Sequence, residues 1–272
     1  MDAEKIMPMY SSLRLAQKYF RYWLTAANGK GHGIHSPFVF DFVTKVLNDK
    51  KPYPAYDPIE GLRRRLLGDN TLLEVEDQGA GSAYAATRTR SIADIARRAA
   101  KPSRLGQLLH RVALRYQPST IIELGASLGL SAAYLASGAP AATLYTIEGA
   151  PAIAAAAERN LRSLHLPATI LPGAFDDVLP GLLPTLPPVD LAFVDGNHRL
   201  DPTLRYFDLL LRHSANSSVL IFDDIHWSAE METAWATIKA DPRVYLTIDL
   251  FFIGFVFRRD EFRVKQDFVI RF

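Results

Sequence analysis

From Pro118 onward the sequence alternates short apolar segments with amphipathic ones, and this alternation constrains the fold more than any other feature. Each apolar segment has the length of one strand, and each amphipathic segment is long enough for a crossover helix. Repeated strand–helix units build a parallel sheet that helices cover on both faces. We expect strands at 120–124, 143–148, 168–171, 191–195 and 219–223, and helices at 130–137, 151–164, 175–183, 202–212 and 229–240.

The end of the chain breaks this repeat. Two apolar segments, 245–250 and 252–257, follow one another with no room for a helix between them, so they must pair antiparallel. The prediction is an α/β fold of five parallel strand–helix units with a terminal antiparallel hairpin, over residues 103–259. We expect residues 1–102 to form a mostly helical cap and residues 260–272 a C-terminal tail of ambiguous structure.

The chain has no cysteine, which excludes disulfides, zinc–thiolate and iron–sulfur sites and a cysteine nucleophile. This composition fits a reducing compartment. The first residues, Met1 to Lys5, lack the apolar run of a signal peptide. The long uncharged run 124–147 is interrupted by glycines and a proline, so we expect no membrane segment and a cytoplasmic location.

Net charge is only +2, but basic residues are in excess before residue 118 and acidic residues after it. Basic helix faces that pack on an acidic partner domain explain this better than a nucleic acid, for which no binding motif is present. Three basic or glycine-rich features have ordinary structural explanations: the arginine run 63–65 as a solvated helix face, the pentapeptide 78–82 as a plain loop, and His32 and His35 as surface or packing residues.

Candidate functional residues follow the predicted strands. Ligands of open parallel sheets bind at the carboxyl ends of the strands. The first strand runs into the segment Glu123 to Gly129, the second ends at Glu148, the fourth at Asp195, and the fifth at Asp223-Asp224. Glycines in the first turn let the backbone approach a ligand, and the helix that follows offers free N–H groups.

A glycine-rich turn followed by an acid about 20 residues later is also typical of dinucleotide-binding proteins. Here, however, the glycines are spaced G-x-x-x-G, and the carboxylate of Glu123 precedes them, ready for an ammonium group. We also expect no further domain after the hairpin to hold a hydride acceptor. These features favour S-adenosylmethionine (SAM); an NAD(P)-dependent oxidoreductase and a non-catalytic SAM-binding module are the alternatives.

Residues from about 103 to 258 resemble a class I SAM-dependent methyltransferase, nearest to the small-molecule O-methyltransferases of the catechol type. The resemblance is carried by Ser103 to Leu109, Ile122 to Ser131, Thr146-Ile147-Glu148, Val194-Asp195 and Phe222-Asp223-Asp224. It implies a seven-stranded Rossmann-like sheet and transfer of a methyl group to an oxygen, or less favourably a nitrogen, of a small-molecule acceptor. The first 100 residues have no counterpart in the catechol-type enzymes and look like an extension found in bacterial methyltransferases.

The resemblance also implies roles for single residues. The turn residues Glu123, Gly125, Ala126, Ser127 and Gly129 would lie beside the methionine end of the cofactor, with Ser131 near its carboxylate. Glu148 would hold the ribose hydroxyls, and Gly173, Ala174 and Phe175 would meet the adenine. Asp195 would lie beside the sulfonium and the acceptor.

In the catechol-type enzymes the counterpart of Asp195 binds a divalent cation together with an Asp-Asn pair, and here that pair is Asp223-Asp224. Three carboxylates would prefer Mg²⁺ or Ca²⁺, although one of the acids could instead cap the next helix. His198 stands where the family has a lysine base. It is a candidate base beside Asp195, and a loop histidine bonded to Asp195 or Asp201 explains it equally well. A homodimer is left open.

Overall fold

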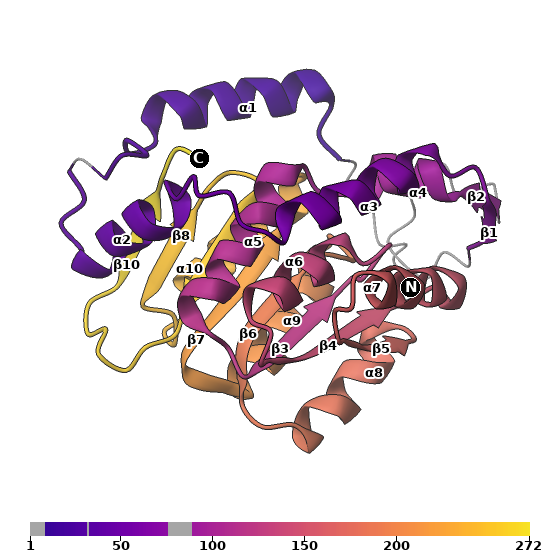
Figure 1. The fold of residues 1–272 in the computed structure, drawn as a ribbon. Coiled ribbons are helices and arrows are strands. Elements are labelled where there is room, and N and C mark those ends of the chain that lie inside the picture. The colour runs from indigo at the N-terminus through magenta and orange to yellow at the C-terminus, as the bar shows by residue number, and fades with distance from the viewer. Residues whose placement is uncertain (1–8, 32, 76–88) are drawn as a thin grey trace, which may run out of the picture.

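The computed structural model describes residues 9–31, 33–75 and 89–272 (Figure 1). The N-terminal segment Met1 to Lys5, His32 and the pentapeptide 78–82 lie outside these residues. The central feature is an eight-stranded sheet with the strand order β10-β8-β9-β7-β6-β3-β4-β5. Its strands are β3 (Thr120–Leu124), β4 (Thr143–Glu148), β5 (Thr169–Pro172), β6 (Val189–Val194), β7 (Ser214–Asp223), β8 (Leu246–Asp249), β9 (Ile253–Phe257) and β10 (Gln266–Val269).

The predicted fold class is confirmed. Strands β3 to β7 are mutually parallel, and β9 runs antiparallel between β7 and β8, as the short connection requires. The difference is an eighth strand, β10, which pairs parallel with β8. The N-terminal segment joins the same edge: the N–H of Ala27 donates to the carbonyl of Val269, and the hydroxyl of Tyr22 donates to the carbonyl of Ile270.

Alternating side chains divide the core between the two faces of the sheet. On β3, Ile121 packs into one cluster with the N-terminal helices, whereas Ile122 and Leu124 pack into the other. The first face is covered by α5 (Ser103–Tyr116), α6 (Leu130–Gly138) and α7 (Pro151–Ser163), and the second by α8 (Phe175–Leu182), α9 (Leu200–Arg212) and α10 (Ala229–Ala240). A short 3₁₀ helix, η2 (Leu183–Thr185), extends α8.

The N-terminal helices pack mostly into the cluster of the first face, whereas α1 packs against Phe251 and Val269 and crosses the top of the molecule in Figure 1. They are α1 (Ser12–Thr25), α2 (Pro37–Phe42) with the π-helical turn η1 (Val43–Leu47), α3 (Tyr56–Gly68) and α4 (Ile92–Ala99). A small antiparallel sheet of β1 (Leu72–Glu74) and β2 (Thr89–Ser91) lies beside them. This N-terminal layer lies over the edge of the sheet where β3 and β4 end, and some of its residues line a cavity there.

Among the described residues, no helix is both long enough and apolar enough to cross a membrane.

Candidate functional site

The turn between β3 and α6 has a backbone that requires glycine. Gly125 adopts φ +102°, and its N–H donates to the carbonyl of Ile147 on β4 over 2.9 Å. A Cβ at this position would lie 2.0 Å from the carbonyl oxygen of Asp195, inside any permitted contact. Gly129, at φ +83°, ends the turn immediately before α6. The turn therefore lies flat against the ends of β4 and β6.

Glu123 is fully buried in β3, on the face that the N-terminal layer covers. Thr146 on the neighbouring strand donates its hydroxyl to Oε2 of Glu123 over 2.5 Å, and Oε1 has no hydrogen-bond partner. Burial raises the pKa of Glu123 to about 7; the charges of Asp195 and Glu148 act in the same direction, whereas the hydroxyl groups of Ser131 and Thr146 oppose it. A buried carboxylate oxygen without a partner is costly, and a cationic donor would satisfy it.

Glu148 ends β4 and holds the same turn from the other side. The N–H of Ser127 donates to its Oε2 over 2.8 Å, and that of Ala150 donates to Oε1 over 3.1 Å. Burial raises the pKa of Glu148, although these backbone donors act against the shift. The N–H of Gly173, at the end of β5, donates to the carbonyl of Glu148, so the third predicted contact region begins directly beside it.

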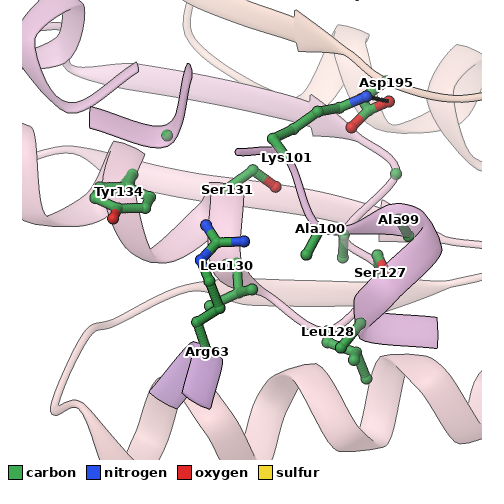
Figure 2. Close-up of a pocket in the computed structure, with 14 residues that line it drawn as sticks. Arg63, Ala99, Ala100, Lys101, Ser127, Leu128, Leu130, Ser131, Tyr134 and Asp195 are labelled. Carbon is green, nitrogen blue, oxygen red and sulfur yellow. Dashed lines mark ion pairs between the residues drawn. The ribbon is translucent and has the colours of Figure 1, made fainter. Parts of the chain in front are cut away.

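Above this turn lies a cavity whose empty space, open solvent included, is about 410 Å³ (Figure 2). Five of the predicted cofactor residues line it: Gly125, Ala126, Ser127, Ser131 and Asp195. The remaining lining comes mostly from the N-terminal layer and from α5 and α6: Arg63, Ala96, Ala99, Ala100, Lys101, Gly106, Leu128, Leu130 and Tyr134. The cavity thus forms between the strand ends and the N-terminal layer.

The other predicted cofactor residues lie around this cavity without lining it. Glu123 lies in the sheet below the turn, Gly129 at its far end, and Glu148 behind Ser127. Phe175, the first residue of α8, packs edge-on against Tyr206 and lies close to Gly196 in the turn after β6. Gly173 and Ala174 precede it, so these three residues occupy the strand end next to that of Glu148.

Three carboxylates converge where β6 and β7 end, and we call Asp195, Asp223 and Asp224 the acidic cluster. The ammonium group of Lys101, from the connection between α4 and α5, lies among them. It forms an ion pair with Oδ2 of Asp223, and it lies 3.1 Å from Oδ1 of Asp195 and 3.8 Å from Oδ2 of Asp224. Oδ1 of Asp223 is buried without a hydrogen-bond partner.

The three carboxylates keep Lys101 charged. Burial lowers the pKa of its amine, but the charges of Asp195, Asp223 and Asp224 outweigh burial and raise it well above the ordinary value. Asp223 has a side chain that is only 1% exposed, so its charge has little access to water. Lys101 is therefore a permanent counter-ion of the acidic cluster.

His198 follows Asp195 in the turn between β6 and α9. Its Nε2 lies 3.6 Å from Oδ1 of Asp195 and 3.8 Å from Oδ2 of Asp224. One ligand atom each from Asp195, His198 and Asp223 lie within 4.8 Å of one another. The structure thus brings both predicted catalytic residues and all three predicted metal ligands to one place.

His226, which follows β7, belongs to a different network. Its Nε2 lies 2.8 Å from Oδ2 of Asp249 and its Nδ1 lies 3.0 Å from Oε1 of Glu232. Lys18 and Tyr10 contact the same Glu232, which fastens α1 to α10. His226 does not line the cavity.

Sequence reasoning missed Lys101 and misjudged Arg63. Arg64 and Arg65 are exposed as predicted for a solvated face, but the side chain of Arg63 is only 12% exposed, pairs with Glu60 over 3.0 Å and lines the cavity near Ser131 (Figure 2). The excess of basic residues before residue 118 was the one available signal, because some of those charges face acidic residues of the sheet domain.

Comparisons with known proteins agree with this geometry. Residues 122–225 match the family described as a methyltransferase domain. The chain is similar in structure to the SAH-bound methyltransferase PaMTH1 of Podospora anserina, at a TM-score of 0.56 and 16% identity, covering 95% of this chain and 100% of that one. No curated protein sequence matches the chain.

Two O-methyltransferases are similar as well. One is that of Bacillus cereus in complex with SAH (TM-score 0.52, 18% identity, 81% of this chain and 97% of that one). The other is TomG of Streptomyces achromogenes, involved in tomaymycin synthesis, in complex with SAM (TM-score 0.52, 22% identity, 76% and 89%). These likenesses confirm the predicted fold.

Proposed function

We propose that this chain, of which residues 122–225 match a methyltransferase domain, is a SAM-dependent enzyme that methylates an oxygen of a small-molecule acceptor. The observation that carries the proposal is the Gly125 turn, which lines the cavity at the strand ends, while Glu123 lies in the sheet below the turn and Glu148 holds Ser127 from behind. The structural neighbours that are O-methyltransferases in complex with SAM or SAH support the same reaction class.

The chain's residues fit the methionine end of this cofactor. The unpartnered Oε1 of Glu123 suits the ammonium group, because a cation there would satisfy a buried acceptor. Ser131, the first turn of α6 and Arg63 suit the carboxylate, because a guanidinium group and a helix N-terminus both favour an anion. Arg63 donates from Nε to Glu60, which holds its guanidinium group at the cavity wall.

Glu148 and Phe175 would hold the nucleoside end. Glu148 accepts hydrogen bonds at both oxygens from backbone N–H groups, which fixes its carboxylate beside the cavity with lone pairs to spare for ribose hydroxyls. Gly173, Ala174 and Phe175 follow at the next strand end, where the adenine would lie.

When bound, SAM supplies an electrophilic methyl group on a sulfonium. The chain's own part is alignment and proton removal: the rigid Gly125 turn and Asp195 fix the position of the reacting atoms, and positioning can account for much of the rate enhancement. Nε2 of His198 accepts the proton of the acceptor hydroxyl, and the nearby carboxylates of Asp195 and Asp224 stabilise the imidazolium that results.

The predicted metal site at Asp195, Asp223 and Asp224 stays a prediction. The oxygen donors suit Mg²⁺ or Ca²⁺, yet the Lys101 ammonium already stands among them, so no step is assigned to a metal here. The cytoplasmic location, the homodimer and the absence of a nucleic-acid partner also stay predictions.

Transfer of a labelled methyl group from SAM to a panel of small phenols and alcohols tests the proposal. Wild type is expected to label at least one hydroxyl, and His198→Gln is expected to lose about 10²-fold in kcat, the usual contribution of a general base. Asp201→Asn, an exposed site on α9, is the matched control and should remain near wild type. SAH binding without transfer to any acceptor would instead support the non-catalytic module.

A further inference from the structure

The acidic cluster holds a cation that belongs to the chain itself. We propose that the ammonium group of Lys101 takes the place of a divalent cation at Asp195, Asp223 and Asp224, so that this enzyme works without a bound metal ion. Its consequence for the reaction rests on the proposed methyltransferase function, whereas its test measures only cation binding.

The geometry makes the lysine and a metal ion mutually exclusive. A metal held by the cluster would lie between the carboxylate oxygens, at roughly 2.0–2.6 Å from each. Lys101 Nζ already occupies that region, because it contacts Oδ2 of Asp223 directly and lies 3.1 Å from Oδ1 of Asp195. A divalent cation could enter only if the ammonium group moved out.

The position of Lys101 in the chain opposes such a movement. Lys101 is followed by Pro102, which directly precedes α5, and the inner face of α5 is anchored in the core through Leu108, Leu109 and Val112, each at most 1% exposed. On the other side, Ala96 in the last turns of α4 is also buried. The lysine is therefore held at both ends by packed helices, and its side chain is 19% exposed.

The charges explain why one ammonium group suffices at this place. It neutralises one of the carboxylates and leaves the cluster with a residual negative charge beside the cavity, which favours a sulfonium. An ammonium group directs three N–H bonds, and Asp195 and Asp223 take two of them. It can therefore contact a single acceptor oxygen but cannot chelate a vicinal diol, so the acceptor class that fits is a compound with one reacting hydroxyl.

Cation binding to the cofactor-free protein tests the proposal. Three proteins are compared: wild type, Lys101→Met, and Lys51→Met as a control at an exposed site. Each is titrated with MnCl₂ by calorimetry, and its Tm is measured with and without a millimolar excess of MgCl₂. Wild type and Lys51→Met are expected to bind no Mn²⁺ and to keep the same Tm. Lys101→Met is expected to melt lower without metal, to bind Mn²⁺ and to regain Tm in MgCl₂, because its carboxylates lack a counter-ion.

Saturable Mn²⁺ binding by wild type would overturn the proposal, and so would a folded Lys101→Met protein that binds Mn²⁺ no better than wild type. If Lys101→Met does not fold, the wild-type titration still decides, and Lys101→Arg should fold and exclude Mn²⁺ because it keeps the charge. The same wild-type sample is also titrated with SAH. Failure to bind SAH would contradict the methyltransferase proposal, and it would leave the Mn²⁺ result unaffected.

Discussion

Replacing Glu123 by glutamine should stabilise the cofactor-free protein relative to wild type, and the gain should grow as pH rises. Glu123 is completely buried, one of its oxygens has no partner, and burial raises its pKa to about 7 from the ordinary value of 4.5. An acid with a raised pKa binds its proton more tightly in the folded state. Ionisation of Glu123 therefore costs stability, and the cost builds up between pH 4.5 and about 7 and is constant above.

The magnitude follows from the shift, since one pKa unit corresponds to about 1.4 kcal/mol. The cost of ionising Glu123 is roughly 3 kcal/mol at pH 8 and about 1 kcal/mol at pH 5. Glutamine has nearly the same shape and does not titrate. Any effect of its amide group on stability is therefore the same at both pH values and cancels in the comparison. The stability of Glu123→Gln relative to wild type should thus rise by about 2 kcal/mol from pH 5 to pH 8.

Urea unfolding of wild type, Glu123→Gln and the control Glu74→Gln at both pH values measures this difference. Glu74 is exposed on β1, and its replacement should leave the difference within a few tenths of a kcal/mol, as for most surface sites. A relative stability of Glu123→Gln that is the same at pH 5 and pH 8 would refute the reasoning, because Glu123 would then not titrate abnormally. The same variant should bind SAH more weakly, since it loses the charge that faces the ammonium group.

Three further outcomes are expected. Gly125→Ala should destabilise the protein by about 1–3 kcal/mol in urea unfolding, because its Cβ would collide with the carbonyl of Asp195; an unchanged midpoint would contradict the tight turn. Arg63→Met should raise the Kd of SAH about tenfold in calorimetry, whereas the exposed control Arg65→Met should not, and equal affinities would remove Arg63 from the carboxylate site. Burial lowers the pKa of His226, but the hydrogen bonds and charges of Asp249 and Glu232 outweigh burial and raise that pKa overall. Wild type should therefore be more stable to unfolding than His226→Gln by about 2 kcal/mol below pH 6.5, and this difference should disappear as pH rises through the folded-state pKa. Urea unfolding at pH 6 and pH 9 checks this, and an advantage that grows with pH would be inconsistent with it.

The strands that carry the cofactor turn could be predicted from sequence because they are central and apolar on both faces. The predicted ranges of β3 and β4 are those of the structure, and their last residues, Leu124 and Glu148, mark the edge where the cavity forms. The start of β7 at Ser214 was missed, because its first five residues are small or polar and carry no apolar pattern.

The helical structure of the N-terminal layer could be predicted more easily than its role in the site. A mostly helical N-terminal region could be predicted, but helical periodicity gives no information on which face of another element a helix covers. Lys101 lies in the short connection between α4 and α5, and only the packing of α5 brings it to the ends of β6 and β7. A tail that alternates only partly became β10, because the edge of β8 was available for pairing.

The most direct test of the account is a calorimetric titration of cofactor-free wild type and Glu148→Ala with SAH, with NAD⁺ and NADP⁺ titrated in parallel. Wild type should bind one SAH per chain, Glu148→Ala should bind it at least tenfold more weakly because the ribose loses its acceptor, and neither dinucleotide should compete. Absence of SAH binding, or tighter binding of a nicotinamide dinucleotide, would contradict the central claim that the strand-end cavity is built for SAM.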